Sequence, residues 1–203
     1  RRVLFRSVEI SDGWMKKAPF GETVSGFPTG YDELLKYDLI VLANMGGGQM
    51  LNGLSQEMLA DYVKAGGGLL LLSGDRTYGQ ANFKNENFLN VLPVTFHKYG
   101  DYGKLAKPSS FQQKDRHPIA TGVTLPAGEV ALYRHHITPK TSAKTVLTFN
   151  TGEPAVIATA GEPRVVVVTA LPFGEASAGK TLYFRGKGWQ TFMAQTMKWL
   201  SRR

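Results

Sequence analysis

The stretch YDLIVLANMGGGQMLNGLSQEMLADYVKAGGGLLLLSGD, residues 37–75, decides the fold. Two unbroken apolar runs, residues 39–42 and 69–72, are typical of strands buried on both faces of a parallel sheet. The segment between them carries apolar residues at helical spacing, with Ser55 as the expected N-cap and Gly66 as the expected left-handed stop. The stretch therefore predicts a strand–helix–strand unit, whose crossover joins parallel strands.

Ligands of such sheets bind at the carboxyl ends of the strands, which are here residues 44–48 and 73–76. Gly46 and Gly47 lead toward a helix N-terminus, where backbone N–H groups can hold an anion. The Gly-Lys-Ser/Thr ending of a P-loop is missing, however, and Leu51 stands where a dinucleotide fingerprint needs its third glycine. A flexible strand-to-helix loop is the favoured interpretation, and no cofactor is expected.

Bulk composition narrows the class of protein. The chain has 203 residues, is 42% hydrophobic and 20% charged, and so fits one domain with a full core. The net charge of +8 comes from scattered basic residues without aromatic interleaving, so we do not expect nucleic-acid binding. No apolar run reaches the roughly 20 residues of a transmembrane helix. The absence of cysteine excludes disulfides and thiolate chemistry, while compartment and oligomeric state stay open.

The rest of the chain divides into further predicted elements. Residues 11–37 read as a long connection that ends in a helical turn capped by Thr29, and residues 99–114 read as a loop. A short helix is expected within residues 82–92 and a strand at 94–97. Hairpin turns separate predicted strands at residues 145–149, 155–159 and 164–169. An apolar stripe from Trp189 to Leu200 predicts a final helix that packs on the sheet.

The first seven residues, RRVLFRS, match the peptide that a common sequencing-library adapter encodes when it is translated in frame. We therefore expect residues 1–7 to be an artefact and the natural reading frame to enter near Val8. On this interpretation residues 8–203 form a single domain that lacks an upstream part.

Four segments together resemble a known family. They are FPTGYDELLKYDLIVLANM (27–45), DYVKAGGGLLLLSGDRTYGQANFKNENFLNVLPV (61–94), RHPIATGV (116–123), and GEPRVVVVTALPFGE followed by GWQTFMAQTMKWL (between 161 and 200). They are similar to the glutamine amidotransferase-like domains of bacteria, the non-catalytic relatives of class I glutamine amidotransferases, which are themselves related to trehalose-utilisation-type domains. The resemblance implies a flavodoxin-like three-layer α/β/α sandwich with a mostly parallel central sheet, and antiparallel strands are expected near the C-terminus.

Class I amidotransferases need a cysteine on the turn after a central strand, and a histidine with a glutamate after a late strand. The corresponding turn here, residues 72–75, is Leu-Ser-Gly-Asp, and the late segment, residues 168–175, offers leucine or proline where the histidine belongs. Glu175 is at most a remnant of the triad. Ser73 lacks the G-x-S-x-G context of a serine nucleophile and more simply satisfies turn backbone. Glutaminase activity is therefore not expected, and no residue is assigned a catalytic role.

The candidate ligand-binding residues lie at the strand ends. Asn44 and Arg76 would donate hydrogen bonds to a ligand, and Asp75 and Glu175 would accept them. Asp75 and Arg76 could equally form a local ion pair that fixes the loop. His135 and His136 are weaker candidates, because adjacent strand residues face opposite sides and cannot easily hold one metal. No metal site is expected.

Three functional hypotheses remain open. The first is a catalytically inactive amidotransferase-like module that binds a small polar ligand or a protein partner at the carboxyl ends of the strands. The second is a hydrolase of a carbohydrate-type metabolite that uses Asp75 or Glu175 as a general base. The third is a structural module of a larger bacterial envelope protein.

Overall fold

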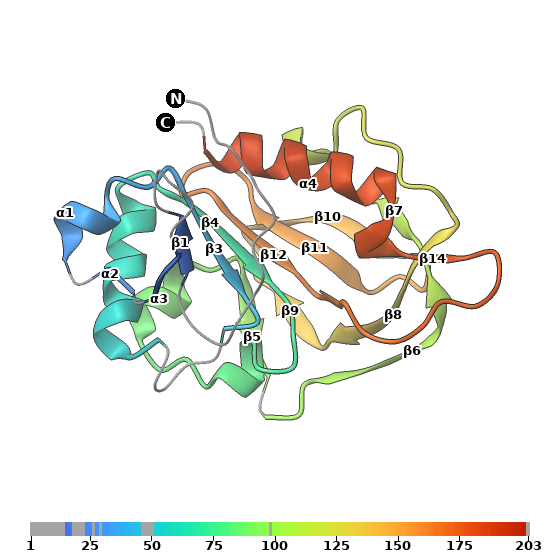
Figure 1. Cartoon of the computed structure of the whole chain (residues 1–203), viewed down its shortest axis with the longest axis horizontal. Helices are drawn as coiled ribbons and strands as arrows, with labels where there is room; N and C mark the ends of the chain where they lie inside the picture. Colours follow the sequence, from blue (N-terminus) through green and yellow to red (C-terminus); the bar gives the residue numbers. More distant parts are fainter. Residues whose placement is uncertain are drawn as a thin grey trace.

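The computed structural model describes residues 15–17, 23–25, 27–28, 30–45, 51–97 and 99–201. Its centre is a six-stranded sheet in the order β3-β4-β12-β11-β10-β7 (Figure 1). β3 and β12 pair with β4 in parallel, whereas β11, β10 and β7 continue the sheet through antiparallel pairs. The strands span Leu39–Ala43 (β3), Gly68–Leu72 (β4), Val165–Val168 (β12), Pro154–Thr159 (β11), Ala143–Phe149 (β10) and Phe111–Gln113 (β7).

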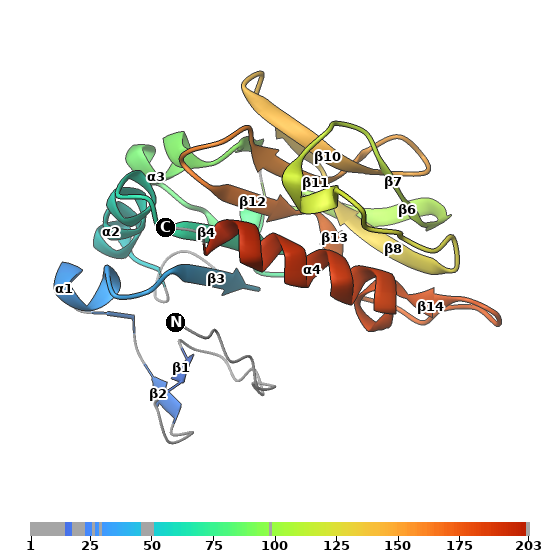
Figure 2. The same cartoon turned by 90° about the horizontal axis from the view of Figure 1, so that it is seen from above.

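Helices cover both faces of this sheet, which gives three layers (Figure 2). Leu69 and Leu71 of β4 pack in one apolar cluster with α2 (Gly53–Lys64) and α3 (Glu86–Val91). Leu70 points the other way, into a cluster with α4 (Lys187–Leu200). Alternate residues of a strand face opposite sides, so the unbroken apolar run of β4 is buried on both faces of the sheet. The fold class, a mixed α/β fold with a parallel core and antiparallel strands, is confirmed.

The ends of α2 differ in part from expectation. The N-cap is Asn52, whose side-chain oxygen accepts the N–H of Ser55 at 2.9 Å, so the expected cap at Ser55 is wrong by three residues. The stop at Gly66 is confirmed, with φ at +93°. The N–H groups of Gly66 and Gly67 bond to the carbonyls of Val63 and Tyr62, which is a Schellman closure.

A smaller sheet packs beside the carboxyl ends of the parallel strands. Its central strand β8 (Glu129–His135) pairs with β6 (Tyr102–Ser109), β13 (Ala170–Leu171) and β14 (Thr181–Leu182). The expected loop at residues 99–114 is therefore wrong. The hydrophobicity pattern does not identify β6 as a strand, because most of its side chains are exposed and only Leu105 and Ser109 are buried.

The remaining elements are short. β5 (Val94–Phe96) pairs with β9 (Ile137–Pro139), and β1 (Met15–Lys17) with β2 (Thr23–Ser25), so residues 11–37 hold a hairpin as well as a connection. α1 (Tyr31–Leu34) begins after Gly30, and the expected cap Thr29 lies outside the described residues. Single 3-10 turns occur at Tyr78–Ala81 (η1), Pro118–Ala120 (η2) and Tyr183–Arg185 (η3). Within the described ranges, no helix has the length and apolar character to cross a membrane.

Candidate functional site

The turn after β4, residues 73–77 (here the β4 turn), is fixed by the residue that ends β3. Asn44 has φ at +51°, a left-handed conformation that asparagine tolerates better than most residues. Its amide oxygen accepts the N–H of Arg76 at 2.9 Å, and its amide nitrogen donates to Asp75 Oδ1 at 3.0 Å. The side chain passes so close to Gly74 that a Cβ there would lie 2.6 Å from Asn44 Cβ. Asn44 therefore ties the ends of two neighbouring parallel strands together.

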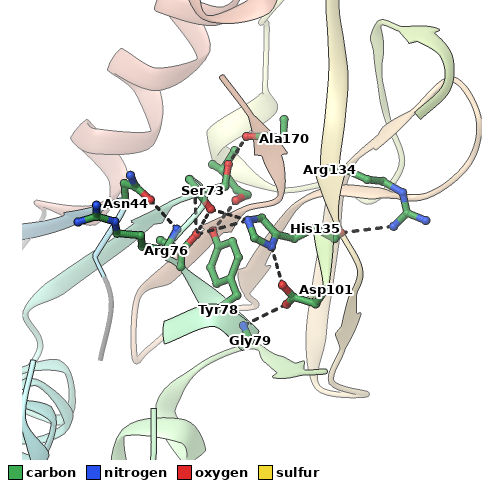
Figure 3. A network of polar contacts seen from close by, with 12 residues as sticks. Asn44, Ser73, Arg76, Tyr78, Gly79, Asp101, Arg134, His135 and Ala170 are labelled. Carbon is green, nitrogen blue, oxygen red and sulfur yellow. Dashed lines mark hydrogen bonds and ion pairs between the residues drawn. The ribbon is translucent and has the colours of Figure 1, made fainter. Parts of the chain in front are cut away.

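Ser73 faces into the protein, away from solvent. It is 6% exposed, and its hydroxyl donates to the carbonyl of Ala170 in β13. The same carbonyl accepts the Tyr183 hydroxyl at 2.7 Å. Ser73 thus joins the β4 turn to the chain just after β12, which is where it passes into the smaller sheet (Figure 3).

Tyr78 anchors the far end of the β4 turn. Its φ is +57°, which is rare for a bulky residue, and its side chain is only 1% exposed. The hydroxyl lies 3.1 Å from the Leu71 carbonyl and 2.5 Å from the Val168 carbonyl, so it bridges the ends of β4 and β12. Burial raises the pKa of Tyr78 well above its ordinary value, which keeps the hydroxyl a donor.

A buried histidine–aspartate pair holds the β4 turn from behind (Figure 3). Nδ1 of His135, the last residue of β8, lies 3.0 Å from Asp101 Oδ1, and both side chains have no exposed surface. Nε2 of His135 lies 2.9 Å from the Gly74 carbonyl oxygen. Asp101 Oδ2 accepts the N–H of Gly79 at 3.0 Å, so the pair contacts the turn and also the chain that follows it.

The polarity of this arrangement decides its chemistry. The Gly74 carbonyl oxygen can only accept, so the hydrogen bond at Nε2 requires that this nitrogen carries a hydrogen, while Nδ1 is paired with the Asp101 carboxyl group. The Thr77 hydroxyl, 3.4 Å from Nε2, is already engaged with Gly74, since it donates to the carbonyl and accepts the N–H at 2.9 Å each. Both ring nitrogens of His135 are therefore engaged with the protein in this geometry and are not available to a substrate.

A cleft of about 680 Å³ opens beside the chain that leaves this turn. Tyr78 and Gly79 form one side of it, Phe83 and Phe96 lie along it, and Lys140 stands at the end of α3. The cleft is thus continuous with the carboxyl-end region of β4, although it lies downstream of the residues that the sequence singled out.

Comparison with known proteins agrees with the geometry. A family model described as "Putative glutamine amidotransferase" matches residues 2–170. The chain belongs to this amidotransferase-like family. No curated protein matches it.

Two solved structures share the fold of this amidotransferase-like chain. One is the cytoplasmic protein STM3548 from Salmonella typhimurium, which is 24% identical, with a TM-score of 0.73 over 88% of this chain and 77% of that one. The other is the cytoplasmic protein STM1381 from Salmonella typhimurium LT2, which is 21% identical, with a TM-score of 0.70 over 87% and 77% of the two chains. At these identities the likeness concerns the fold alone.

The amidotransferase-like fold brings some of the expected site residues together. Asn44, Ser73, Asp75 and Arg76 meet around the β4 turn, and His135 lies directly behind it. Asp75 and Arg76 are exposed, so their side chains are within reach of solvent. Gly46 and Gly47 lie outside the described residues.

His136 and Glu175 are placed differently from the others. His136 is exposed whereas His135 is buried, as expected for adjacent residues at a strand end. Burial and the neighbouring Arg134 lower the pKa of His136. Glu175 is exposed and forms no hydrogen bond or ion pair with the part of the chain that the structure describes. No group of three or more metal-ligating acidic or histidine side chains occurs among the described residues.

The sequence reading missed Asp101, Thr77 and Tyr78. Asp101 was missed because residues 99–114 read as a loop, so nothing indicated that its side chain is buried. The signal that could have found Tyr78 is the aromatic residue directly after Ser-Gly-Asp-Arg-Thr, at the carboxyl end of a predicted central strand.

Proposed function

We propose that this chain is a binding module of the amidotransferase-like family that lacks glutaminase chemistry and takes a small polar ligand beside the β4 turn. The observation that carries the proposal is the state of Ser73. The family's chemistry needs a nucleophile that is exposed at this turn and faces a base. Here the Ser73 hydroxyl is buried and donates to a backbone carbonyl, and the nearby His135 is held between two acceptors.

The rigidity of the β4 turn supports a binding role. Asn44, Tyr78 and the His135–Asp101 pair fix it from three directions through largely buried hydrogen bonds. A site that is fixed before binding loses less conformational entropy when its ligand arrives. The same chain segment then supplies exposed side chains, Asp75 and Arg76, and one wall of the adjoining cleft. These are the surfaces that we assign to a ligand or partner.

The alternative of a hydrolase receives less support. A carboxylate base is usually found in a closed pocket beside a histidine, where its pKa is shifted. Asp75 is exposed and bonded to Asn44, and Glu175 is exposed. Asp101 is the carboxylate that pairs with a histidine, and it has no exposed surface with which to meet a substrate.

Glutamine hydrolysis tests the first half of the proposal. Purified protein and its Ser73→Ala variant are compared for ammonia release from glutamine against a blank without protein. We expect neither to exceed the blank. Ammonia release by the wild type that Ser73→Ala abolishes would sink the proposal.

A thermal-shift screen against sugars, carboxylates, nucleotides and divalent metals tests the second half. It is run on wild type, on Asp75→Ala and on Asp32→Ala, a matched loss of an exposed carboxylate in α1. We expect at least one compound to raise the melting temperature of wild type and of Asp32→Ala. A shift that survives Asp75→Ala removes Asp75 from the site. No shift with any compound contradicts the binding role and favours a structural module.

A further inference from the structure

The cleft beside η1 has an aromatic lining. The rings of Tyr78 and Phe96 stack with centroids 5.4 Å apart, and Phe83 approaches Phe96 at 5.9 Å. Tyr78 and Phe83 are buried, Phe96 is half-buried, and Tyr99 at the rim is 85% exposed. Aromatic surface that is left partly uncovered beside a cleft can stack on a planar ligand.

The charged lining of the cleft has a single sign. Lys140 lines it, and none of the described residues around it is acidic. Its other polar groups are mainly side-chain amides, such as those of Asn82 and Asn90. A cavity with this balance favours a ligand that carries negative charge.

Lys140 has an unused donor in this position. Its ammonium donates to the carbonyls of Leu89 at 2.8 Å and Asn90 at 3.2 Å, at the C-terminal end of α3. A lysine ammonium has three hydrogens, and the third has no partner among the described residues. Burial lowers the pKa of Lys140, because the ammonium has lost part of its hydration. An anionic oxygen that accepts the third hydrogen would replace the hydration that the ammonium loses through burial.

We propose that this cleft binds a small aromatic anion, a planar ring that bears a carboxylate or a phosphate. The ring stacks against Phe96 and Tyr99, the anionic group accepts a hydrogen bond from Lys140, and the amides of Asn82 and Asn90 serve polar ring atoms. This inference rests on the proposed binding function and specifies its ligand class.

A purely structural role for Lys140 needs separate treatment. Lysine at a helix C-terminus bonds to the last carbonyls and stabilises the helix without any ligand. Replacing it would then weaken α3 and would affect every ligand of the cleft alike. The informative quantity is therefore the ratio of affinities for a charged and a neutral ligand of the same shape, because a general loss of structure cancels in that ratio.

The test measures the binding of benzoate, phenyl phosphate, benzamide and acetate by titration in two-dimensional amide NMR. In wild type we expect benzoate or phenyl phosphate to bind roughly tenfold more tightly than benzamide, as a charge-assisted hydrogen bond at a half-buried site provides. Whichever anion binds more tightly identifies the group. Shifts should centre on Gly79, Asn82 and Thr95, which line the cleft.

Three variants complete the test. Lys140→Met should bring the anion-to-benzamide ratio close to one, whereas Lys198→Met, which removes a lysine from the last turn of α4, should leave it unchanged. Phe96→Leu should weaken benzoate and benzamide together by roughly threefold, in line with the loss of one stacked ring, and leave acetate unaffected. A ratio that survives Lys140→Met, or no binding in any arm, overturns the inference. Shifts centred on Asp75 and Arg76 overturn it too, but leave the proposed binding function standing.

Discussion

Gly74→Ala tests whether the contact between Asn44 and the β4 turn organises this region. A Cβ on Gly74 would overlap the amide group of Asn44 and lie 2.6 Å from its Cβ. The obstacle includes Asn44 Cβ, which side-chain rotation does not move, so the clash is relieved only if the Asn44 amide rotates away and the backbone shifts as well. This rearrangement breaks the bonds to the Arg76 N–H and to Asp75. The conformation of Gly74 itself adds no penalty, because its φ is not in the left-handed region.

The expected size follows from these two losses. Overpacking costs about 1–3 kcal/mol. Each hydrogen bond is worth about 0.5–1.5 kcal/mol, with the lower end appropriate because Asp75 and Arg76 are exposed. We expect Gly74→Ala to lower the free energy of unfolding by about 2–3 kcal/mol. Gly128→Ala, where an added Cβ meets nothing within 4 Å, should stay within about 0.5 kcal/mol of wild type.

A double-mutant cycle with Asn44→Gly, read by urea denaturation, checks the cause. Glycine tolerates the φ of +51° at position 44 and removes the obstructing side chain. In the Asn44→Gly background, Gly74→Ala should cost less than about 1 kcal/mol. An equal penalty in both backgrounds would refute the reasoning, because it would show that Gly74 meets an obstacle other than Asn44.

Other predictions concern buried groups elsewhere in the chain. His135→Ala should lower the free energy of unfolding by about 3–5 kcal/mol, because Asp101 is left as an unpaired buried charge; adding Asp101→Ala should cost far less than the sum of the single changes. Glu129→Ala should cost about 1–3 kcal/mol by urea denaturation, because the Glu129 carboxylate accepts the first N–H groups of α4 at 2.9 and 3.0 Å; Glu129→Gln, which keeps an acceptor, should cost less. Burial lowers the pKa of His117 below that of the unfolded chain, so the stability of its neutral form is present above about pH 6.5 and is lost as the pH falls. The free energy of unfolding, measured from pH 7.5 downward, should fall less steeply in His117→Gln than in wild type. A slope of the same sign should remain in the variant, because the pKa of His136 is also lowered.

The parallel core could be predicted because its signals are local. β3, β4 and β12 are short apolar runs, and α4 carries its apolar stripe within 14 consecutive residues. Each of these patterns reports burial without knowledge of any partner strand. The hairpins from β10 to β12 are also indicated by a local pattern, namely glycine-containing turns between apolar runs.

The smaller sheet could not be predicted, because long-range pairing defines it. β6 contains Gly103, Pro108 and two lysines, and most of its residues are exposed. It is a strand because β8 lies beside it, with Tyr102 opposite His135. A pattern along the sequence does not identify such a partner, so it also could not predict the burial of Asp101, which directly precedes β6.

The proximity of the strand-end residues was predictable, but their hydrogen-bond partners were not. Strand ends of a parallel sheet meet at one edge, and in agreement with this rule Asn44, Ser73, Asp75 and Arg76 lie close together around the β4 turn. The same rule cannot tell whether a polar side chain faces a ligand or its neighbour. Asn44 and Ser73 form their hydrogen bonds within the protein itself, with partners that are distant in the sequence.

The His135–Asp101 pair has the layout of a catalytic dyad, but the direction of its hydrogen bond at Nε2 differs from that of a base. The Asp101 carboxyl group at Nδ1 and the Thr77 hydroxyl near Nε2 have the layout of a catalytic base with its orienting acid and its nucleophile. A base, however, must present a lone pair at Nε2 to a group that can give up a proton. At Nε2 the pair meets a carbonyl oxygen at 2.9 Å, which can only accept. The imidazole therefore donates from Nε2 to the Gly74 carbonyl and holds the β4 turn against β8, which is the arrangement of a structural brace.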